Sequence, residues 1–154
     1  PLLKLKQIKT RKKHRNMQKI KKSKNNRNSI VISLGDPAGI GTEITLKALG
    51  SKLLNENIQP LLVGCKNNIY ETYSKLIDSG IKNIPTPKDL EILDIPLEKE
   101  VVPGIVDKKT GAASFKWLDN ATKLILEGQA KALVTAPISK IAWHKAGHNF
   151  AGQT

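Results

Sequence analysis

Two loops hold the residues of this 154-residue sequence that are best suited to binding a ligand. The first is GDPAGIG at 35–41, in which Gly35, Asp36, Gly39 and Gly41 follow a short apolar run. Glycine lets a backbone approach a ligand closely, and free amide groups at such a turn attract phosphate or carboxylate groups. The spacing GxxxGxG is neither the GxGxxG dinucleotide fingerprint nor the GxxxxGK[ST] phosphate loop. A structural tight turn and a ligand-contacting loop therefore both stay open.

The second loop is TAPISK at 135–140, which also follows an apolar run. Thr135 ends that run, and Lys140 could bring an ammonium group to a phosphate or carboxylate. A solvated lysine in the first turn of a helix is an equal alternative for Lys140. Two roles also stay open for Asp36: it could orient a cationic or hydroxyl group, or it could simply form a turn.

Apolar runs alternate with amphipathic stretches, which predicts an α/β fold with a mostly parallel, layered sheet and helices on both faces. Thr42 is expected to cap the first helix, and the run at 132–135 is expected to be a buried strand. The predicted strands are 30–34, 60–64, 90–95 and 132–135, and the predicted helices are 43–49, 68–78, 111–128 and 139–146.

Both loops come directly after a predicted strand. Ligands of open parallel sheets collect beyond the carboxyl ends of the strands, so we expect 35–41 and 135–140 to lie at one edge and to form one site.

Charge divides the chain into a basic tail, 1–29, and a body, 30–154. The tail holds 12 of the 26 Lys and Arg residues and no acid, which leaves 14 basic and 13 acidic residues in the body. We expect the tail to be disordered. Met17 is the only methionine, which leaves open that residues 1–16 lie upstream of the true start. A transit peptide also stays open, and nonspecific nucleic-acid binding through the tail is an alternative function, although the tail has no aromatic residue for stacking.

Cysteine and histidine are too sparse to indicate redox or metal chemistry within this chain. Cys65 is the sole cysteine, which excludes an internal disulfide and is typical of a cytoplasmic protein. His144 and His148 are four residues apart, but Gly147 interrupts the helix and no third ligand lies close in sequence, so we expect no metal site there. No apolar stretch reaches the length of a membrane span.

Four motifs occur in the order and at the distances that resemble the 4-hydroxythreonine-4-phosphate dehydrogenase family of vitamin B6 biosynthesis. They are GDPAGIGTEI at 35–44, GAAS at 111–114, ALVTAPISK at 132–140 and AGHNFAGQT at 146–154. The resemblance runs from about Ile30 to Thr154. It implies a fold similar to isocitrate and isopropylmalate dehydrogenases, of which 30–154 would be an incomplete, N-terminal part.

The resemblance also implies a reaction. An enzyme of this family oxidises 4-phosphooxy-L-threonine with NAD or NADP, and decarboxylation then gives 3-amino-2-oxopropyl phosphate for pyridoxal phosphate. A divalent metal (Zn, Mg or Co) assists, and the enzyme is a homodimer with the active site at the subunit interface. No membrane or specific nucleic-acid partner is implied.

Few functional residues of the family match positions in this sequence. The substrate-contacting His-Thr pair corresponds to Gln153 and Thr154, and Gln153 can donate a hydrogen bond but cannot take a positive charge. The family's metal-binding histidines, with the lysine, asparagine and arginine of its substrate pocket, are expected beyond residue 154. The catalytic residues are therefore unknown here, and this piece alone is expected to be inactive.

Two other enzyme classes stay open. A sister dehydrogenase acting on 4-phospho-threonate or 4-phospho-erythronate would bind the phosphate group of its substrate in the same way. An acyl- or phosphotransferase on a similar layered fold is a further alternative, because anion-binding loops do not reveal which bond is broken.

Overall fold

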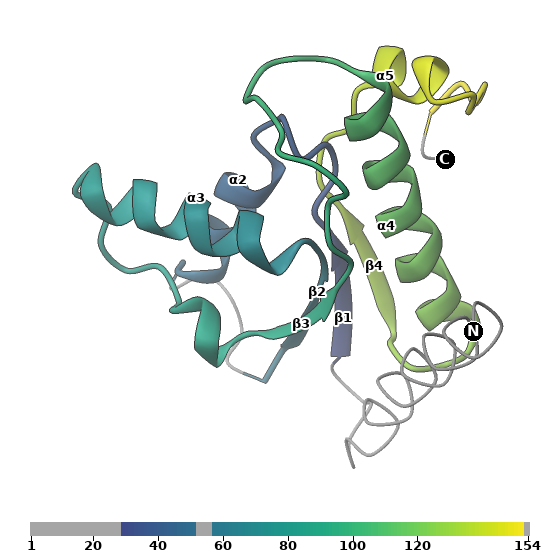
Figure 1. Cartoon of the computed structure of the whole chain (residues 1–154). Helices are drawn as coiled ribbons and strands as arrows, with labels where there is room; N and C mark the ends of the chain where they lie inside the picture. The colour runs from purple at the N-terminus through teal and green to yellow at the C-terminus, as the bar shows by residue number, and fades with distance from the viewer. Residues whose placement is uncertain (1–28, 52–56, 153–154) are drawn as a thin grey trace, which may run out of the picture.

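The computed structural model describes residues 29–51 and 57–152, in which one sheet of four strands is flanked by helices (Figure 1). The strands are β1 (Ser29–Ser33), β2 (Gln59–Gly64), β3 (Glu91–Asp94) and β4 (Ala132–Thr135). The helices are α2 (Gly41–Leu49), α3 (Lys66–Asp78), α4 (Lys108–Leu126), α5 (Lys140–Lys145) and the short 3-10 helix η2 (Pro87–Asp89).

All pairs of neighbouring strands run parallel, in the order β3-β2-β1-β4. In the centre, Ile32 of β1 pairs with Leu62 of β2 on one side and with Val134 of β4 on the other. The chain builds β1, β2 and β3 in one direction and then crosses back through α4 to place β4 on the opposite side of β1. The predicted parallel sheet is confirmed, and each predicted strand or helix away from α4 is found within two residues of its expected ends.

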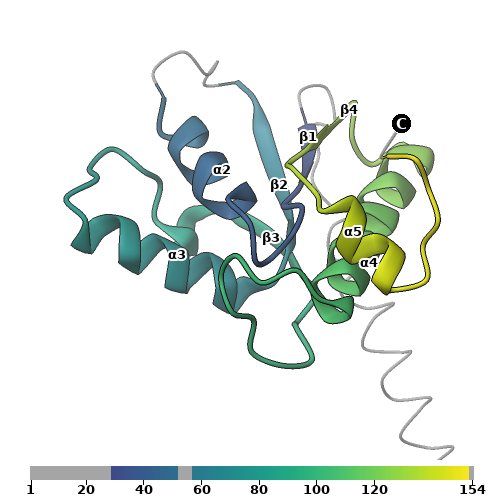
Figure 2. The ribbon, with the colours of Figure 1, turned by 90° about the horizontal axis from the view of Figure 1, so that it is seen from above.

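Helices cover both faces of the sheet, as predicted: α2 and α3 lie on one face and α4 lies on the other (Figures 1 and 2). Central strand residues are buried without alternation, because a parallel sheet covered on both faces has no solvent side. Val31 and Leu62 are fully buried, as are Leu46 of α2 and Trp117 of α4. These side chains join the two helical layers into one hydrophobic core.

Helix α4 begins three residues before its predicted start because Asp107 caps it. The Asp107 carboxylate accepts hydrogen bonds from the amides of Lys109 (2.6 Å) and Thr110 (2.9 Å), and Thr110 completes the capping box. The helix ends at Leu126, and Gly128 follows with φ +68°, a conformation that glycine adopts without strain.

Two expectations need correction. Ser29, which the charge pattern assigned to the tail, is the first residue of β1, and the rest of the tail lies outside the described residues. Strand β4 is not buried: only Leu133 is partly covered, because β4 is an edge strand with β1 as its one partner in the described sheet. Among the described residues, no helix has the length and apolar character needed to cross a membrane.

Candidate functional site

The two predicted loops lie side by side at the carboxyl edge of the sheet. The amide of Asp36 donates to the carbonyl of Pro137 at 2.9 Å, and the amide of Ala136 donates to the carbonyl of Ser33 at 2.9 Å. The expectation that 35–41 and 135–140 share one edge is therefore confirmed.

The position of this edge in the topology is also favourable for a ligand. Strands β1 and β4 are neighbours, but the chain leaves β1 toward β2 and reaches β4 only after crossing back. The loops after β1 and β4 consequently flank the point at which the strand order reverses. In open α/β sheets, ligands bind in the crevice at this switch point.

Close backbone packing accounts for two of the glycines. Gly35 has φ +72°, and a Cβ placed on it would lie 2.2 Å from the carbonyl oxygen of Pro137. A Cβ on Gly41 would lie 2.1 Å from the carbonyl oxygen of Leu34. Any side chain at Gly35 or Gly41 would push the loop away from its neighbour. Backbone packing alone thus explains why glycine is needed at these two positions, and ligand contact by the loop stays a prediction.

Three of the six amides of the glycine loop already have acceptors. Besides the bond from Asp36 to Pro137, Ala38 N donates to Asp36 Oδ1 at 2.9 Å and Gly39 N donates to the Asp36 carbonyl at 3.0 Å. An anion would therefore find its free donors one step later, at the start of α2. There the amides of residues 41–43 donate to no acceptor among the described residues, and the positive end of the helix dipole adds to them.

Thr42 does not cap α2, which corrects that expectation. The helix begins at Gly41, so Thr42 is already its second residue, and the N-cap position belongs to Ile40, which has no capping side chain. The hydroxyl of Thr42 instead donates to Asn68 Oδ1 at 2.9 Å and links α2 to α3.

Asp36 is a buried turn residue, with 6% of its surface exposed. Burial raises the pKa of its carboxyl group, because the charged form loses hydration; the hydrogen bonds from the Ala38 amide and the Thr110 side chain oppose the rise, and the charge of Asp107 adds to it. The carboxylate closes its own turn and contacts the start of α4. This geometry favours the turn-forming role over contact with a ligand.

Lys140 is the first residue of α5 and is exposed to solvent. The helix starts there because Ser139 caps it: Ser139 Oγ accepts a hydrogen bond from the amide of Ala142 at 3.2 Å. The Lys140 ammonium has no hydrogen bond or ion pair with any residue that the structure describes, so it can still meet an anion. Thr135 lies exposed at the end of β4.

The predicted substrate pair, Gln153 and Thr154, lies outside the described residues. Gly152, which precedes the pair directly, is described and lies beside Lys140: a Cβ on Gly152 would be 3.8 Å from Cε of Lys140. The structure thus brings the chain that leads to the pair to the same lysine that the sequence selected.

A third segment at this edge was missed by the sequence reasoning. The amide of Gly104 donates to the carbonyl of Ala38 at 2.7 Å, and Lys145 Nζ donates to the carbonyl of Val106 at 3.0 Å. Residues 101–107 therefore join the glycine loop to α5. Their sequence, VVPGIVD, has no clear period, and its only signal was the turn dipeptide Pro103-Gly104.

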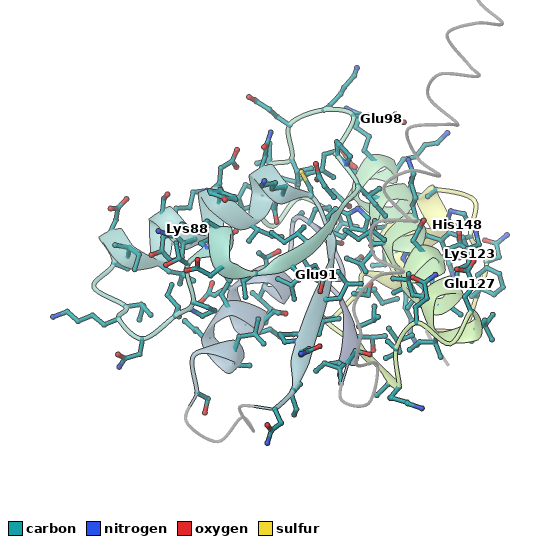
Figure 3. All side chains as sticks on the ribbon, turned by 90° about the horizontal axis from the view of Figure 1, so that it is seen from below. Lys88, Glu91, Glu98, Lys123, Glu127 and His148 are labelled. Atoms are coloured by element: carbon teal, nitrogen blue, oxygen red, sulfur yellow. The ribbon has the colours of Figure 1, made fainter. Side chains whose placement is uncertain are left out.

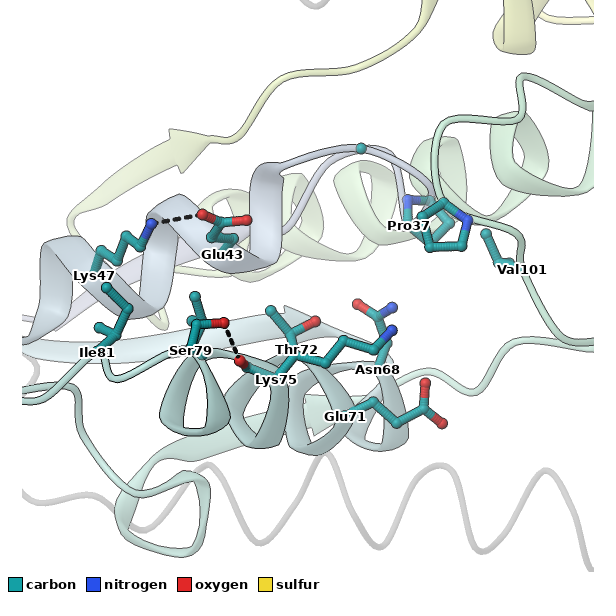
Figure 4. Close-up of a pocket in the computed structure, with 13 residues that line it drawn as sticks. Pro37, Glu43, Lys47, Asn68, Glu71, Thr72, Lys75, Ser79, Ile81 and Val101 are labelled. Carbon is teal, nitrogen blue, oxygen red and sulfur yellow. Dashed lines mark hydrogen bonds and ion pairs between the residues drawn. The ribbon is translucent and has the colours of Figure 1, made fainter.

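A polar groove of about 350 Å³ between α2 and α3 opens beside the glycine loop (Figure 4). Pro37 and Gly39 form its end at the loop. Along one side, Lys47 pairs with Glu43 at 2.6 Å. The groove passes beside the start of α2 and has room for a small ligand.

The described residues do not form a metal centre: no three His, Cys, Asp or Glu side chains among them come together. Helix α5 ends at Lys145, and Gly147 turns the chain with φ +89°, so His144 and His148 do not follow one helix. The His148 ring stacks on Phe115 instead. The divalent metal that the resemblance implies thus finds no ligand set here. Cys65 is 4% exposed and packs in the hydrophobic core.

Comparison with known proteins gives consistent results. The family model for the pyridoxal phosphate biosynthetic protein PdxA matches residues 48–154. A 4-hydroxythreonine-4-phosphate dehydrogenase of Synechococcus sp. (strain RCC307) is 49% identical over 125 residues, which cover 81% of this chain and 37% of that protein. A D-threonate 4-phosphate dehydrogenase of Pectobacterium atrosepticum is 35% identical over 136 residues, with 81% of this chain and 41% of the relative covered.

A solved structure agrees with these relatives. The 4-hydroxythreonine-4-phosphate dehydrogenase of Klebsiella pneumoniae superimposes with a TM-score of 0.67 at 31% identity, covering 81% of this chain and 42% of that one. This chain therefore spans about two fifths of the length of the proteins that it matches. The sequence, the parallel sheet and the paired loops lead to one conclusion: the chain belongs to the pyridoxal phosphate biosynthetic protein PdxA family.

Proposed function

We propose that this chain is part of an NAD- or NADP-dependent dehydrogenase that oxidises 4-phosphooxy-L-threonine in pyridoxal phosphate biosynthesis. Loss of carbon dioxide from the oxidised product gives 3-amino-2-oxopropyl phosphate. The observation that carries the proposal is the contact between the loops after β1 and β4 at the switch point, in a chain of this family. The enzyme is proposed to be a cytoplasmic homodimer.

The contribution of this chain is to bind and orient the anionic groups of the substrate. The free amides at the start of α2 suit a phosphate or carboxylate, and the ammonium of Lys140 can neutralise its charge. The nicotinamide cofactor, when bound, accepts the hydride from the carbon that carries the hydroxyl group. The chain spans about two fifths of the length of its relatives, and we propose that the metal's ligands lie in the part of the enzyme beyond residue 154.

Turnover by the full-length enzyme tests the proposal. We expect NADH or NADPH to form from 4-phosphooxy-L-threonine with the full-length protein and not with the 154-residue chain alone. Steady activity of the 154-residue chain, or a full-length enzyme that prefers 4-phospho-threonate or 4-phospho-erythronate, would contradict it.

Lys140 gives a sharper test within the chain. Lys140→Ala in the full-length enzyme should lower kcat/KM about tenfold or more, because a hydrogen bond to a charged group is lost, and Lys140→Arg should recover part of it. Lys123→Ala is the matched control, because Lys123 lies on the exposed side of α4 and pairs with Asp119. If the Lys140 and Lys123 variants behave alike, Lys140 does not bind the substrate.

The nucleic-acid alternative depends only on the basic tail, and the comparisons favour a dehydrogenase over it. Salt-dependent retention on DNA that disappears when residues 1–29 are removed would be a nonspecific effect of the tail. Sequence preference that survives this deletion would favour the alternative instead.

A further inference from the structure

After α5 the chain turns back beside α4 (Figure 2), and His148, labelled in Figure 3, lies on this segment. Contacts between aromatic side chains hold the segment against α4. Four residues form this aromatic cluster: Phe115 of α4, Trp143 of α5, and His148 and Phe150 of the following segment. The His148 ring stacks on Phe115 with a centroid distance of 3.6 Å and an interplanar angle of 11°. Phe150 lies parallel to Phe115 at 5.8 Å, and Trp143 meets it edge-on at 5.4 Å.

The base of this cluster is tightly packed. The indole N–H of Trp143 donates to Ser114 Oγ at 2.8 Å, and both side chains are buried. A Cβ on Gly111 would lie 1.9 Å from the carbonyl oxygen of Ala142, so α4 and α5 are in backbone contact. Phe115 is therefore fixed on a rigid platform, since neither helix can shift without breaking these contacts.

Both the backbone and the side chains of the segment after α5 contact this platform. The amide of His148 donates to the carbonyl of Trp143 at 2.9 Å, which holds the backbone. The stacking of His148 and Phe150 on Phe115 holds the side chains. Phe150 is 54% exposed, so contact with Phe115 rather than burial in the core accounts for its place.

The consequence of this attachment lies two residues further on, where Gly152 comes to rest against Lys140. We propose that Phe115 is a positioning residue: its ring holds His148 and Phe150, which keeps Gly152 beside Lys140. This inference rests on the proposed function, which takes Lys140 as a substrate contact. Phe115 thus acts through His148 and Phe150.

A residue that orders a binding segment in advance makes the free energy of substrate binding more favourable. Without the stack, the segment 148–152 has to be ordered each time the substrate binds, and the ordering reduces affinity. An aromatic pair of ordinary strength corresponds to roughly a two- to tenfold change in an equilibrium constant. The loss should appear in KM, with kcat nearly unchanged, because the interaction contributes equally to the bound substrate and the transition state.

The experiment compares three variants of the full-length enzyme. Phe115→Leu keeps an apolar side chain but removes the ring, and should raise the KM for 4-phosphooxy-L-threonine roughly two- to tenfold. Phe115→Tyr keeps the ring and should restore the wild-type KM. Leu126→Ala is the control, because Leu126 lies on the same helix, is 81% exposed and is remote from the aromatic cluster.

Hydrogen–deuterium exchange provides a readout that does not need activity. Amides 148–152 should exchange faster in Phe115→Leu and at the wild-type rate in Phe115→Tyr. Unchanged exchange in Phe115→Leu, or equal losses of kcat in the Leu and Tyr variants, would overturn the inference. If the wild-type enzyme does not turn over the substrate, the proposed function fails, and the exchange comparison still decides whether Phe115 orders the segment.

Discussion

Gly35→Ala should destabilise the chain strongly, because Gly35 is the position where both loops at the carboxyl edge meet. The new methyl group faces two separate obstacles. The backbone has φ +72°, which L-residues with a Cβ rarely adopt, and the Cβ would lie 2.2 Å from the carbonyl oxygen of Pro137. Either the loop or β4 must move, and the movement breaks the hydrogen bond from Asp36 to Pro137.

The magnitude follows from these parts. A left-handed conformation costs a residue with a Cβ roughly 1–2 kcal/mol. Forcing an extra carbon into a packed site typically costs about 1–3 kcal/mol, and the lost hydrogen bond adds about 1 kcal/mol. The free energy of unfolding should therefore fall by roughly 3–6 kcal/mol. With a urea m-value of about 2 kcal/mol/M, the unfolding midpoint falls by roughly 1.5–3 M.

Two matched variants separate the obstacles. Gly80→Ala tests the backbone alone, because Gly80 has φ +83° and a Cβ there would meet nothing within 4 Å. Gly41→Ala tests the collision alone, because a Cβ there would lie 2.1 Å from the Leu34 carbonyl while φ is not positive. Urea titrations followed by the fluorescence of Trp117 and Trp143 give all three values.

We expect Gly35→Ala to lower the free energy of unfolding by about 2 kcal/mol or more beyond the loss caused by Gly80→Ala. A Gly35→Ala chain that fails to fold agrees with this expectation. Equal shifts for the variants at 35 and 80 would refute the reasoning, because the contact with Pro137 would then contribute nothing.

Two other predictions concern the carboxylates at this edge. Asp36→Asn keeps an acceptor for the Ala38 amide and removes the buried charge. Burial raises the pKa of Asp36, so the stability linked to its protonated form is complete below its ordinary value of 3.8 and is lost as pH rises through the raised value. The Asn variant should thus be more stable than the wild type at neutral pH and show no advantage below pH 3.8 in urea titrations. Hydrogen bonds from the amides of Thr110 and Lys109 lower the pKa of Asp107, so its stabilisation is present above its ordinary value and is lost as pH falls through the lowered one. Asp107→Ala should accordingly lower the urea midpoint at neutral pH, and the difference from the wild type should shrink well below pH 3.8. Equal midpoints for wild type and variant at neutral pH would contradict the capping role.

Much of the fold followed from local patterns. The apolar runs at 30–34 and 60–64 were long enough for strands and too short for helices, and their lack of alternation matched a sheet covered on both faces. The face of α4 was visible in the spacing of Trp117, Ala121 and Leu124, all of which are buried. The shared edge of the two loops followed from parallel topology alone.

The errors concern features that depend on neighbours distant in sequence. The exposure of β4 depends on its place at the edge of the sheet, which the run at 132–135 does not encode. The Thr42 hydroxyl was expected to cap a helix, but Asn68 provides an acceptor from another helix. The glycine loop seemed able to offer its amides to an anion, yet Pro137, about 100 residues away, already accepts one of them.

The adjacency of β1 and β4 has a consequence for how the chain is made. Ser29 and Gln129, which meet at the start of these strands, are 100 residues apart in sequence. Contacts of such separation form slowly, because a long loop must close before they stabilise anything. During synthesis, β1 must wait for most of the chain to leave the ribosome before its second partner exists. The crevice between the two loops should therefore be among the last parts of the molecule to assemble.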